Sequence, residues 1–378
     1  MNLKSYIFLT ALLGLTTSAA ADSFLFLAAA NDQDLVSYRI DPQSGALSEH
    51  ARLQLPGVGG AMSLTRDGEM LYAHAHIKAE GEKQAKPHIV SLKNNRGKLE
   101  QLHIAPVAFR SPAFHVDNTG RAILASNFGG AIGVWKIDEN RRCTGESTYD
   151  EQTVHYAHSI MTDPTNRFAY SPHTKANVIY QYAFDSEART LTPLNPTTTP
   201  GPDKDHHYHE PRHYAHHPTL AMGFTANERG GGISSWKQDP QTGNLTLQET
   251  LSTLHADWEG KASFAGADIH ITPNGRFVYV SNRDGRRDLE EGQPRGDSLA
   301  GFSIDPTTGK LKSIGQFLTG RFPRSFCIDT TGSFLFAANE LSHTLTAFRI
   351  HPETGALKHI GKYETGKTPI WVVCWSKK

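Results

Sequence analysis

The sequence predicts an all-β fold of short antiparallel strands, and three observations carry that prediction. A two-strand phrase around an Asp/Pro/Asn/Gly turn recurs along the chain, a second turn of the DPxTG type follows, and no segment beyond the N-terminus keeps a helical period. The repeat is about fifty residues long, which suits one blade of four strands. We therefore expect a β-propeller.

The two turns of each unit are recognisable because Asp, Pro and Gly stand at fixed offsets, with Gly supplying a positive φ. The first turn and its flanking strands read FHVDNTGRAILASN (114–127), IMTDPTNRFAYSPH (160–173), IHITPNGRFVYVSN (269–282) and FCIDTTGSFLFAAN (326–339). The second turn reads DPQSGALS (41–48), DPQTGNLTL (239–247), DPTTGKLKSI (305–314) and HPETGALKHI (351–360).

The number of units predicts seven blades of four antiparallel strands. First turns are anchored at Asp67, Asp117, Asp163, His217, Thr272 and Asp329. A further unit begins at 24–32 without a first strand, and the chain ends in an unassigned apolar strand at 369–375. If that C-terminal strand completes blade one, the ring closes without an open edge. A β-solenoid is the alternative, but its coils are shorter and would not leave complementary fragments at the two ends.

Composition excludes some partners. Of 378 residues, 38 are basic and 38 acidic, so no long-range attraction to nucleic acid or to an anionic membrane is predicted. The three cysteines show no framework spacing. We expect Cys327 and Cys374 to pack as small hydrophobic residues within strands, and none of the three to be a catalytic nucleophile.

The N-terminus resembles a secretory signal. Lys4 is followed by an apolar run at 6–15 and by Ala19-Ala20-Ala21, which suits cleavage before Asp22. A retained membrane anchor fits less well, because the run is about ten residues and a span needs roughly 20. The predicted domains are a signal peptide at 1–21 and one propeller at 22–378. The mature protein is expected to be periplasmic, with no membrane span. Three polar segments that interrupt the repeat, at 76–88, 197–210 and 284–297, are expected to be loops.

Aligning the units by their first turn defines three columns of residues. Five positions before the anchor stand Pro112, His158, Arg212, Ala267 and Arg324. Seven positions after the turn glycine stand Asn127, His173, Asn227, Asn282 and Asn339, followed by Phe128, Thr174, Glu228, Arg283 and Glu340. In an antiparallel blade these positions lie on the face opposite the turns. We therefore expect them to surround one mouth of the central channel.

Each column residue also has a structural explanation. A charged residue at a strand end is usually just solvated, and an Asn there usually caps backbone groups. Charges occur in only some blades, however, whereas a scaffold feature would recur in all of them. Asp268 shares a strand face with His270 and could orient an arginine, although a buried structural ion pair explains it equally well.

The charged residues suit an anionic, oxygen-rich substrate. Guanidinium groups bind carboxylate or phosphate and can stabilise the oxyanion formed when water attacks a carbonyl, while Glu228 or His158 takes the proton. No serine elbow, P-loop or dinucleotide fingerprint is present. Six histidines stand between His206 and His217, with Glu210 as the nearby acid. Their spacing is a weak metal signal, and a polar loop leading into a strand that holds His213, His216 or His217 is favoured.

Several phrases resemble the seven-bladed propeller lactonase family, which includes bacterial 6-phosphogluconolactonase and the fungal carboxy-muconate lactonising enzyme. They are NFGGAIGVWKI (127–137), AHSIMTDPTNRFAY (157–170), PRHYAHHP with NE (211–218, 227–228), ADIHITPNGRFVYVSNR (267–283), PRSFCIDTTGSFLFAANE (323–340) and GKTPIWVVCW (366–375). The resemblance implies a metal-independent lactonase without a cofactor. It also implies that the catalytic residues are His158, Arg212, Glu228 and Arg283.

We therefore expect a hydrolase that opens a small anionic sugar or organic-acid lactone. Residues expected to contact the substrate are Arg324, Asn127, Asn227, Asn282, Asp268 and Glu340. A cycloisomerase that closes a carboxylate onto a double bond would use the same groups. A periplasmic binding or scaffold propeller is the non-enzymatic alternative. No oligomeric state is predicted.

Overall fold

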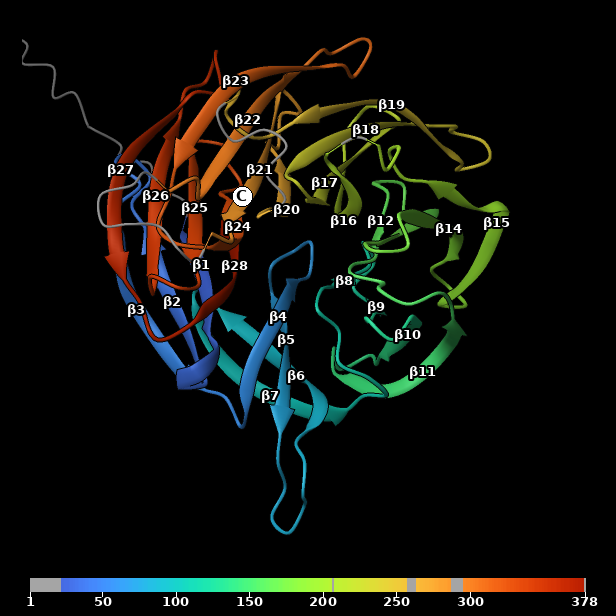
Figure 1. The fold of residues 1–378 in the computed structure, drawn as a ribbon. Helices are drawn as coiled ribbons and strands as arrows, with labels where there is room; N and C mark the ends of the chain where they lie inside the picture. Colours follow the sequence, from blue (N-terminus) through green and yellow to red (C-terminus); the bar gives the residue numbers. More distant parts are fainter. Residues whose placement is uncertain (1–21, 206, 257–262, 287–294, 377–378) are drawn as a thin grey trace, which may run out of the picture.

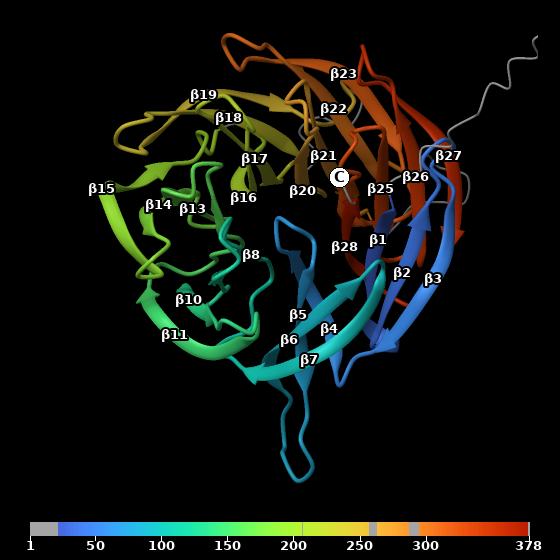
Figure 2. The ribbon, with the colours of Figure 1, turned by 180° about the vertical axis from the view of Figure 1, so that it is seen from behind.

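A ring of antiparallel sheets surrounds a central axis, as Figures 1 and 2 show from its two ends. The computed structural model describes residues 22–205, 207–256, 263–286 and 295–376. These residues form 28 strands and one short 3₁₀ helix, η1 (Ala30–Asp32). None of their helices is long and apolar enough to cross a membrane.

Seven blades of four strands follow from the pairing, each beginning with its innermost strand. The first three are β28 (Pro369–Ser376), β1 (Ser23–Ala29), β2 (Asp34–Ile40), β3 (Leu47–Gln54); β4 (Val58–Leu64), β5 (Met70–Ile77), β6 (Lys86–Asn95), β7 (Lys98–Pro106); and β8 (Phe114–Val116), β9 (Ala122–Ser126), β10 (Ala131–Ile137), β11 (Cys143–Gln152).

Blades four to seven continue the same order. They are β12 (Met161–Thr162), β13 (Phe168–His173), β14 (Val178–Asp185), β15 (Thr190–Pro200); β16 (His209–His216), β17 (Met222–Arg229), β18 (Gly232–Gln238), β19 (Leu245–Ser252); β20 (Phe264–Ile271), β21 (Phe277–Asp284), β22 (Ser298–Ile304), β23 (Leu311–Leu318); and β24 (Pro323–Ile328), β25 (Phe334–Asn339), β26 (Thr344–Ile350), β27 (Leu357–Glu364). A single pair, Arg229 with Ala265, joins blades five and six into one sheet.

The C-terminal strand closes the ring as expected. β28 pairs antiparallel with β1, Phe26 opposite Val373, and becomes the innermost strand of blade one. Figure 1 shows the red β28 beside the blue β1. Our expectation for two cysteines is wrong, because Cys327 of β24 and Cys374 of β28 form a disulfide with Cα atoms 5.8 Å apart. The two thiols meet because β24 and β28 are neighbouring innermost strands. The spacing of the cysteines along the sequence does not reveal that these strands are neighbours. Cys143 is a buried free thiol.

Turn chemistry explains why each unit folds into the same blade. The Asp117 carboxylate accepts hydrogen bonds from the Arg121 and Ala122 amides, both at 2.9 Å, and Gly120 has φ +71°. One anchor is misassigned: in blade two the equivalent backbone bond, to Met70 O at 3.0 Å, comes from Thr65, not Asp67. The Thr65 hydroxyl bonds the Asp67 carboxylate at 2.6 Å, so the aspartate supports the turn from two residues further on.

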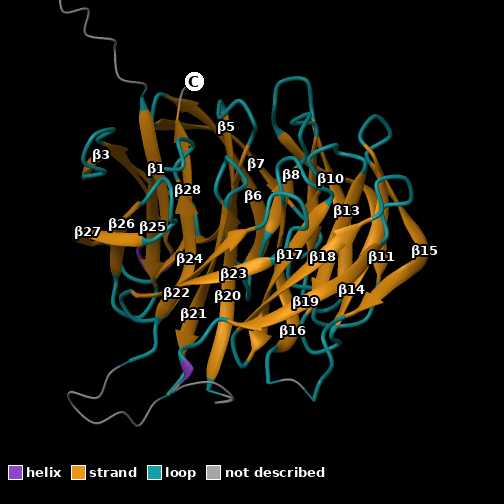
Figure 3. Ribbon diagram, turned by 90° about the horizontal axis from the view of Figure 1, so that it is seen from above, coloured by secondary structure: helices purple, strands orange, loops and turns teal. Residues whose placement is uncertain are grey.

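The core lies between blades, where side chains of adjacent sheets interdigitate. Phe24 and Phe26 of blade one pack with Leu71 and Val90 of blade two, and every one of these side chains is fully buried. The same arrangement recurs around the ring, so each blade is stabilised chiefly by its neighbours. Figure 3 shows that the loops gather at the two ends of the strands.

The three segments expected to be loops are partly strand. Strands β5 and β6 extend to Ile77 and from Lys86, and β15 runs to Pro200, so only the middle of the first two segments is irregular. Antiparallel pairing of the flanking residues lengthens these hairpins beyond the apolar pattern. In the third segment, residues 287–294 lie outside the described residues.

Candidate active site

Bulges on the innermost strands position the first column of predicted residues. The register of β16 with β17 shifts between Pro211 and His213, and the register of β24 with β25 shifts between Pro323 and Ser325. Arg212 and Arg324 are therefore the extra residues of two bulges. A bulge re-aims the side chain that it carries, so the same irregularity in different blades directs both arginines to one end of the channel.

Arg212, Glu228 and Arg283 converge on one atom although they come from three strands of two blades. Glu228 Oε1 lies 2.9 Å from Arg283 Nη2 and 3.6 Å from Arg212 Nε. Each guanidinium also donates to a backbone carbonyl of β20: Arg212 to Ala267 O at 2.5 Å, and Arg283 to Gly266 O at 3.0 Å. These bonds fix both arginines against the same strand.

The two arginines of this cluster are buried and Glu228 is partly exposed, and burial strengthens the electrostatic interactions among them. The exposed fraction of the side chain is 2% for Arg212, 7% for Arg283 and 29% for Glu228. Burial alone would raise the pKa of the Glu228 carboxyl, but the charges of Arg212 and Arg283 outweigh it and hold that pKa below its ordinary value. Burial lowers the pKa of both guanidiniums, and the negative charge of Glu228 opposes that shift.

Arg324 and Glu340 form a second pair at the same end of the channel. Arg324 Nη1 lies 3.7 Å from Glu340 Oε2, within blade seven. The charge of Arg324 also contributes to the lowered pKa of Glu228 and of Arg212, so the two pairs share one electrostatic site. Three arginines against two glutamates leave one positive charge in excess.

His158 lies beside this cluster and precedes β12. Its side chain is buried and its ring packs edge-on against Phe128, with ring centres 5.0 Å apart. The backbone amide of His158 donates to Pro172 O at 3.0 Å, and this bond fixes the position of His158 relative to β13. Burial lowers the pKa of this imidazole well below its ordinary value, and Arg212 lowers it further, so His158 is neutral at pH 7.

Asp268 has imidazole partners, and the idea that it orients an arginine finds no support in its contacts. His213 Nδ1 lies 2.8 Å from Asp268 Oδ1, and His270 Nε2 lies 3.3 Å from Oδ2. The Phe326 amide also donates to Oδ2, at 3.2 Å. Burial opposes ionisation of this carboxyl, but His270 and His213 hold its pKa well below the ordinary value.

The asparagine column makes its hydrogen bonds inside the scaffold. Asn127 Oδ1 accepts from the Ala131 amide at 3.2 Å, and Asn227 Nδ2 donates to Ser234 Oγ at 2.8 Å. Asn282 Oδ1 accepts from Thr253 Oγ1 at 2.6 Å. Each of these contacts ties the end of one strand to a neighbouring strand or loop. A role in contacting substrate stays a prediction for all three.

The described histidines of the 207–217 segment do not gather into a ligand set. His213 and His216 lie in β16 and His217 follows it, while His209 Nδ1 and Glu210 Oε1 are 3.9 Å apart. Among the described residues, which exclude His206, no group of three His, Cys, Asp or Glu side chains could hold a metal ion.

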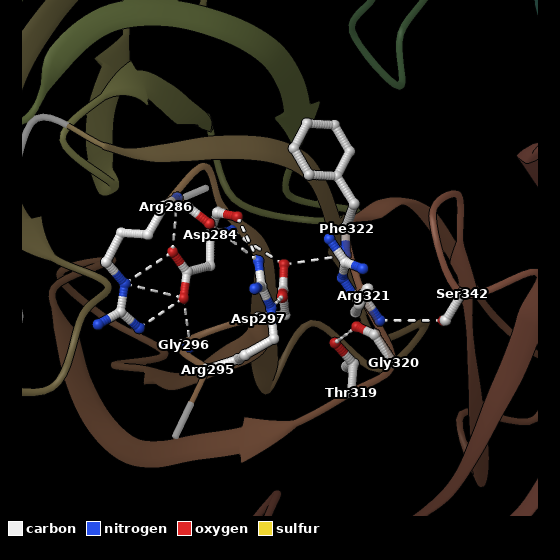
Figure 4. A network of polar contacts seen from close by, with 10 residues as sticks. All are labelled: Asp284, Arg286, Arg295, Gly296, Asp297, Thr319, Gly320, Arg321, Phe322 and Ser342. Atoms are coloured by element: carbon white, nitrogen blue, oxygen red, sulfur yellow. Dashed lines mark hydrogen bonds and ion pairs between the residues drawn. The ribbon is translucent and has the colours of Figure 1, made fainter. Parts of the chain in front are cut away.

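The two stems of the 284–297 insertion, which directly follows Arg283, are held together by hydrogen bonds and ion pairs, as Figure 4 shows. Arg286 Nη2 bonds Asp284 Oδ2 at 2.6 Å, and Arg295 Nε bonds Asp297 Oδ2 at 3.0 Å. The Asp297 Oδ1 atom accepts hydrogen bonds from the Asp284 and Phe322 amides, both at 2.9 Å. The Phe322 ring in turn lies 5.3 Å from the Arg283 guanidinium carbon. These bonds therefore connect the insertion to the site through one aromatic contact.

A cavity of about 170 Å³ continues along the axis beneath the charged cluster. All seven innermost strands, or residues next to them, contribute to its wall, which includes His115, Ser159, His213, Asp268, Ser325 and Trp371. His213 was not among the predicted site residues. It follows Arg212 as Asp268 follows Ala267, so extending the repeat alignment by one position would have selected it.

Comparison with known proteins agrees with this architecture. The family model described as "Lactonase, 7-bladed beta-propeller" matches residues 27–374. A 6-phosphogluconolactonase of Cronobacter sakazakii is 26% identical over 352 residues, 92% of this chain and 97% of the relative. A 6-phosphogluconolactonase of Formosa agariphila is 27% identical over 302 residues, 75% of this chain and 79% of the relative.

Solved structures share the fold at lower identity. The periplasmic gluconolactonase of Pseudomonas aeruginosa superposes with a TM-score of 0.77 at 20% identity, over 92% of this chain and 98% of that one. A protein from Lactobacillus plantarum superposes with a TM-score of 0.77 at 22% identity, over 94% and 99%. Because the family model covers nearly the whole described chain, the protein belongs to the seven-bladed β-propeller lactonase family.

Proposed function

We propose that the protein hydrolyses a small anionic sugar or organic-acid lactone at the mouth formed by His158, Arg212, Glu228 and Arg283. The observation that carries this proposal is the convergence of two buried arginines on one Glu228 oxygen beside a neutral imidazole. The names of the relatives, 6-phosphogluconolactonase, support the reaction class.

The two arginines have donors left for a substrate. Arg212 Nε and Arg283 Nε are buried, and neither has a hydrogen-bond partner among the described residues. A carbonyl oxygen that enters this site and gains negative charge would satisfy them, and buried charge-assisted hydrogen bonds are the strong ones. The excess positive charge, with Arg324 the most exposed of the three guanidiniums, would hold a carboxylate or phosphate of the same substrate.

His158 is the better proton acceptor of the two that the sequence suggested. The arginines lower the pKa of both groups, but the Glu228 carboxylate is already paired with two guanidiniums and serves to hold them. His158 is neutral and lies next to the same cluster. In the proposed step, water attacks the lactone carbonyl, His158 takes its proton, and the arginines bind the oxyanion. Collapse breaks the ring C–O bond, and the leaving oxygen takes the proton from His158.

We propose export to the periplasm, which bears on the substrate. The Cys327–Cys374 disulfide suits an oxidising compartment, and Asp22, the first residue after the predicted cleavage, is held by ion pairs with Arg39 and Arg96. A periplasmic gluconolactonase shares the fold. Sugar phosphates of central metabolism are not expected there, so an unphosphorylated lactone is favoured.

Hydrolysis of a lactone panel that pairs gluconolactone with its 6-phosphate tests both parts of the proposal. Arg212→Ala should reduce kcat/KM by about 100-fold or more, as loss of an oxyanion donor does. Glu228→Ala should also reduce it strongly, because it removes the carboxylate that holds Arg212 and Arg283 in place. Arg121→Ala is the matched control, because Arg121 pairs with Glu187 on the turn face. Unchanged turnover of every active lactone by both mouth variants would show that the site is elsewhere. A preference for the phosphorylated lactone would contradict the substrate choice alone.

A further inference from the structure

Two buried imidazole nitrogens without partners belong to rings that touch. His158 Nδ1 and His213 Nε2 are both buried, and neither has a hydrogen-bond partner among the described residues. The ring centres of His158 and His213 are 5.0 Å apart, with the planes inclined at 58°. At that separation, nitrogens that face each other reach hydrogen-bond distance, about 2.7–3.2 Å, after a small ring rotation. Leaving both buried nitrogens unpaired would destabilise the fold, because each would give up its bonds to water on folding without gaining a partner in exchange.

The protonation of His213 is set by its other nitrogen. His213 Nδ1 lies 2.8 Å from the ionised carboxylate of Asp268, which only accepts hydrogen bonds, so the proton of neutral His213 is on Nδ1. The free Nε2 is then an acceptor. This acceptor needs a hydrogen-bond donor, and the unpartnered Nδ1 belongs to the His158 ring that contacts His213.

We propose that Asp268, His213 and His158 form a relay in which Asp268 accepts from His213 Nδ1–H and His213 Nε2 accepts from His158 Nδ1–H. This leaves His158 Nε2 as a lone-pair acceptor for the mouth. Asp268 and His213 are positioning residues: they fix the tautomer of His158 and do not touch the substrate. The hydrogen-bond relay stands without the proposed function, but its catalytic role rests on that function.

The relay also stabilises the charged intermediate. When His158 Nε2 takes a proton from the attacking water, the imidazolium keeps its Nδ1–H bond to His213, whose own Nδ1–H remains on Asp268. The carboxylate thus stabilises the positive charge through two successive hydrogen bonds and does not take the proton itself. The proton then leaves on the ring oxygen of the opened lactone.

The other charged groups around the two imidazole rings explain why Asp268 is needed. Arg212, Arg283 and Arg324 act on His158, and all three disfavour its protonated form. Arg212 and His270 act on His213 in the same direction, and burial is the largest effect on both imidazoles. Asp268 is the acidic group that opposes them at His213, where its hydrogen bond and its charge favour the protonated ring.

Nitrogen NMR of the ¹⁵N-histidine-labelled protein tests the relay without any substrate. We expect His158 to show a protonated Nδ1 and an unprotonated Nε2, with a strongly downfield Nδ1–H proton. In His213→Phe, which keeps a ring against His158, that proton signal should disappear. His115→Gln is the matched control, because His115 lines the same cavity but bonds Thr162 Oγ1. The opposite His158 tautomer in the unsubstituted protein would overturn the relay.

Kinetics test the catalytic role. Asp268→Asn and His213→Phe should each lower kcat by about 100-fold and leave KM within about threefold, whereas His115→Gln should leave both unchanged. Thermal melts identify a variant that fails to fold, in which case His213→Gln, which retains a donor and an acceptor, replaces it and should recover part of kcat. If the unsubstituted protein hydrolyses lactones and the folded variants keep full kcat, the relay has no catalytic role although the proposed function stands. If no lactone is hydrolysed, the proposed function fails, and the NMR result still decides the relay.

Discussion

Replacing Glu228 by Gln tests whether the mouth is held together by charge. The substitution keeps the shape of the side chain and removes the negative charge that faces Arg283 at 2.9 Å and Arg212 at 3.6 Å. Two unit charges 4 Å apart attract by about 4 kcal/mol at an effective dielectric constant of 20, and part of that attraction offsets desolvation. Removing one partner of a buried pair typically costs about 3–5 kcal/mol. Because the Glu228 side chain is 29% exposed, we expect a loss of about 2–3 kcal/mol.

The pH dependence of that loss identifies its origin. The folded-state pKa of Glu228 lies below its ordinary value of 4.5, so its charge stabilises the fold above pH 4.5 and loses that effect as pH falls through the lower folded-state pKa. Thermal melts should show Glu228→Gln a few degrees below the unsubstituted protein at pH 7, and the gap should shrink below pH 4.5. A gap of equal size at pH 7 and pH 3 would refute the reasoning, since a packing defect does not titrate with this carboxyl.

Three further predictions concern the scaffold and the chemistry. Replacing Cys327 and Cys374 together by Ser should lower the free energy of unfolding by about 2–4 kcal/mol, measured by denaturant unfolding, and a reductant should affect only the unsubstituted protein. Asp117→Ala removes the acceptor of three backbone amides and should cost about 2 kcal/mol, whereas Asp41→Ala at an exposed turn should cost clearly less; equal losses would contradict the role given to burial. Lactone hydrolysis should survive exhaustive chelation, and loss of activity that Zn²⁺ restores would direct attention back to the histidines at 206–217.

The fold was predictable because the same pattern of apolar strands and Asp/Gly turns recurs along the chain. Turn residues such as Asp117 and Gly120 fix where each strand begins, and a terminal strand without a partner must pair with the unit that lacks one. The position of the anchor in blade two was not predictable in this way. Thr65 and Asp67 both suit a turn, and only the backbone bond from Thr65 distinguishes them.

The candidate site was predictable in outline for the same reason. Columns defined by the repeat selected Arg212, Glu228 and Arg283, and these three residues do converge. The columns did not indicate which carboxylate holds which cation. Arg324 pairs with Glu340 of its own blade, whereas Glu228 pairs with an arginine of the next blade as well as its own.

The sequence by itself determined the strands, the turns, the closure of the ring and the set of charged residues at one mouth, because all of these depend on local pattern repeated at a fixed period. Only the tertiary structure decided which residues of different blades meet. The disulfide of Cys327 with Cys374, the partnership of Asp268 with His213 and the contact of His213 with His158 each join two neighbouring blades. Such contacts depend on how the sheets are inclined and where their inner strands bulge, and no periodic pattern along the chain records either.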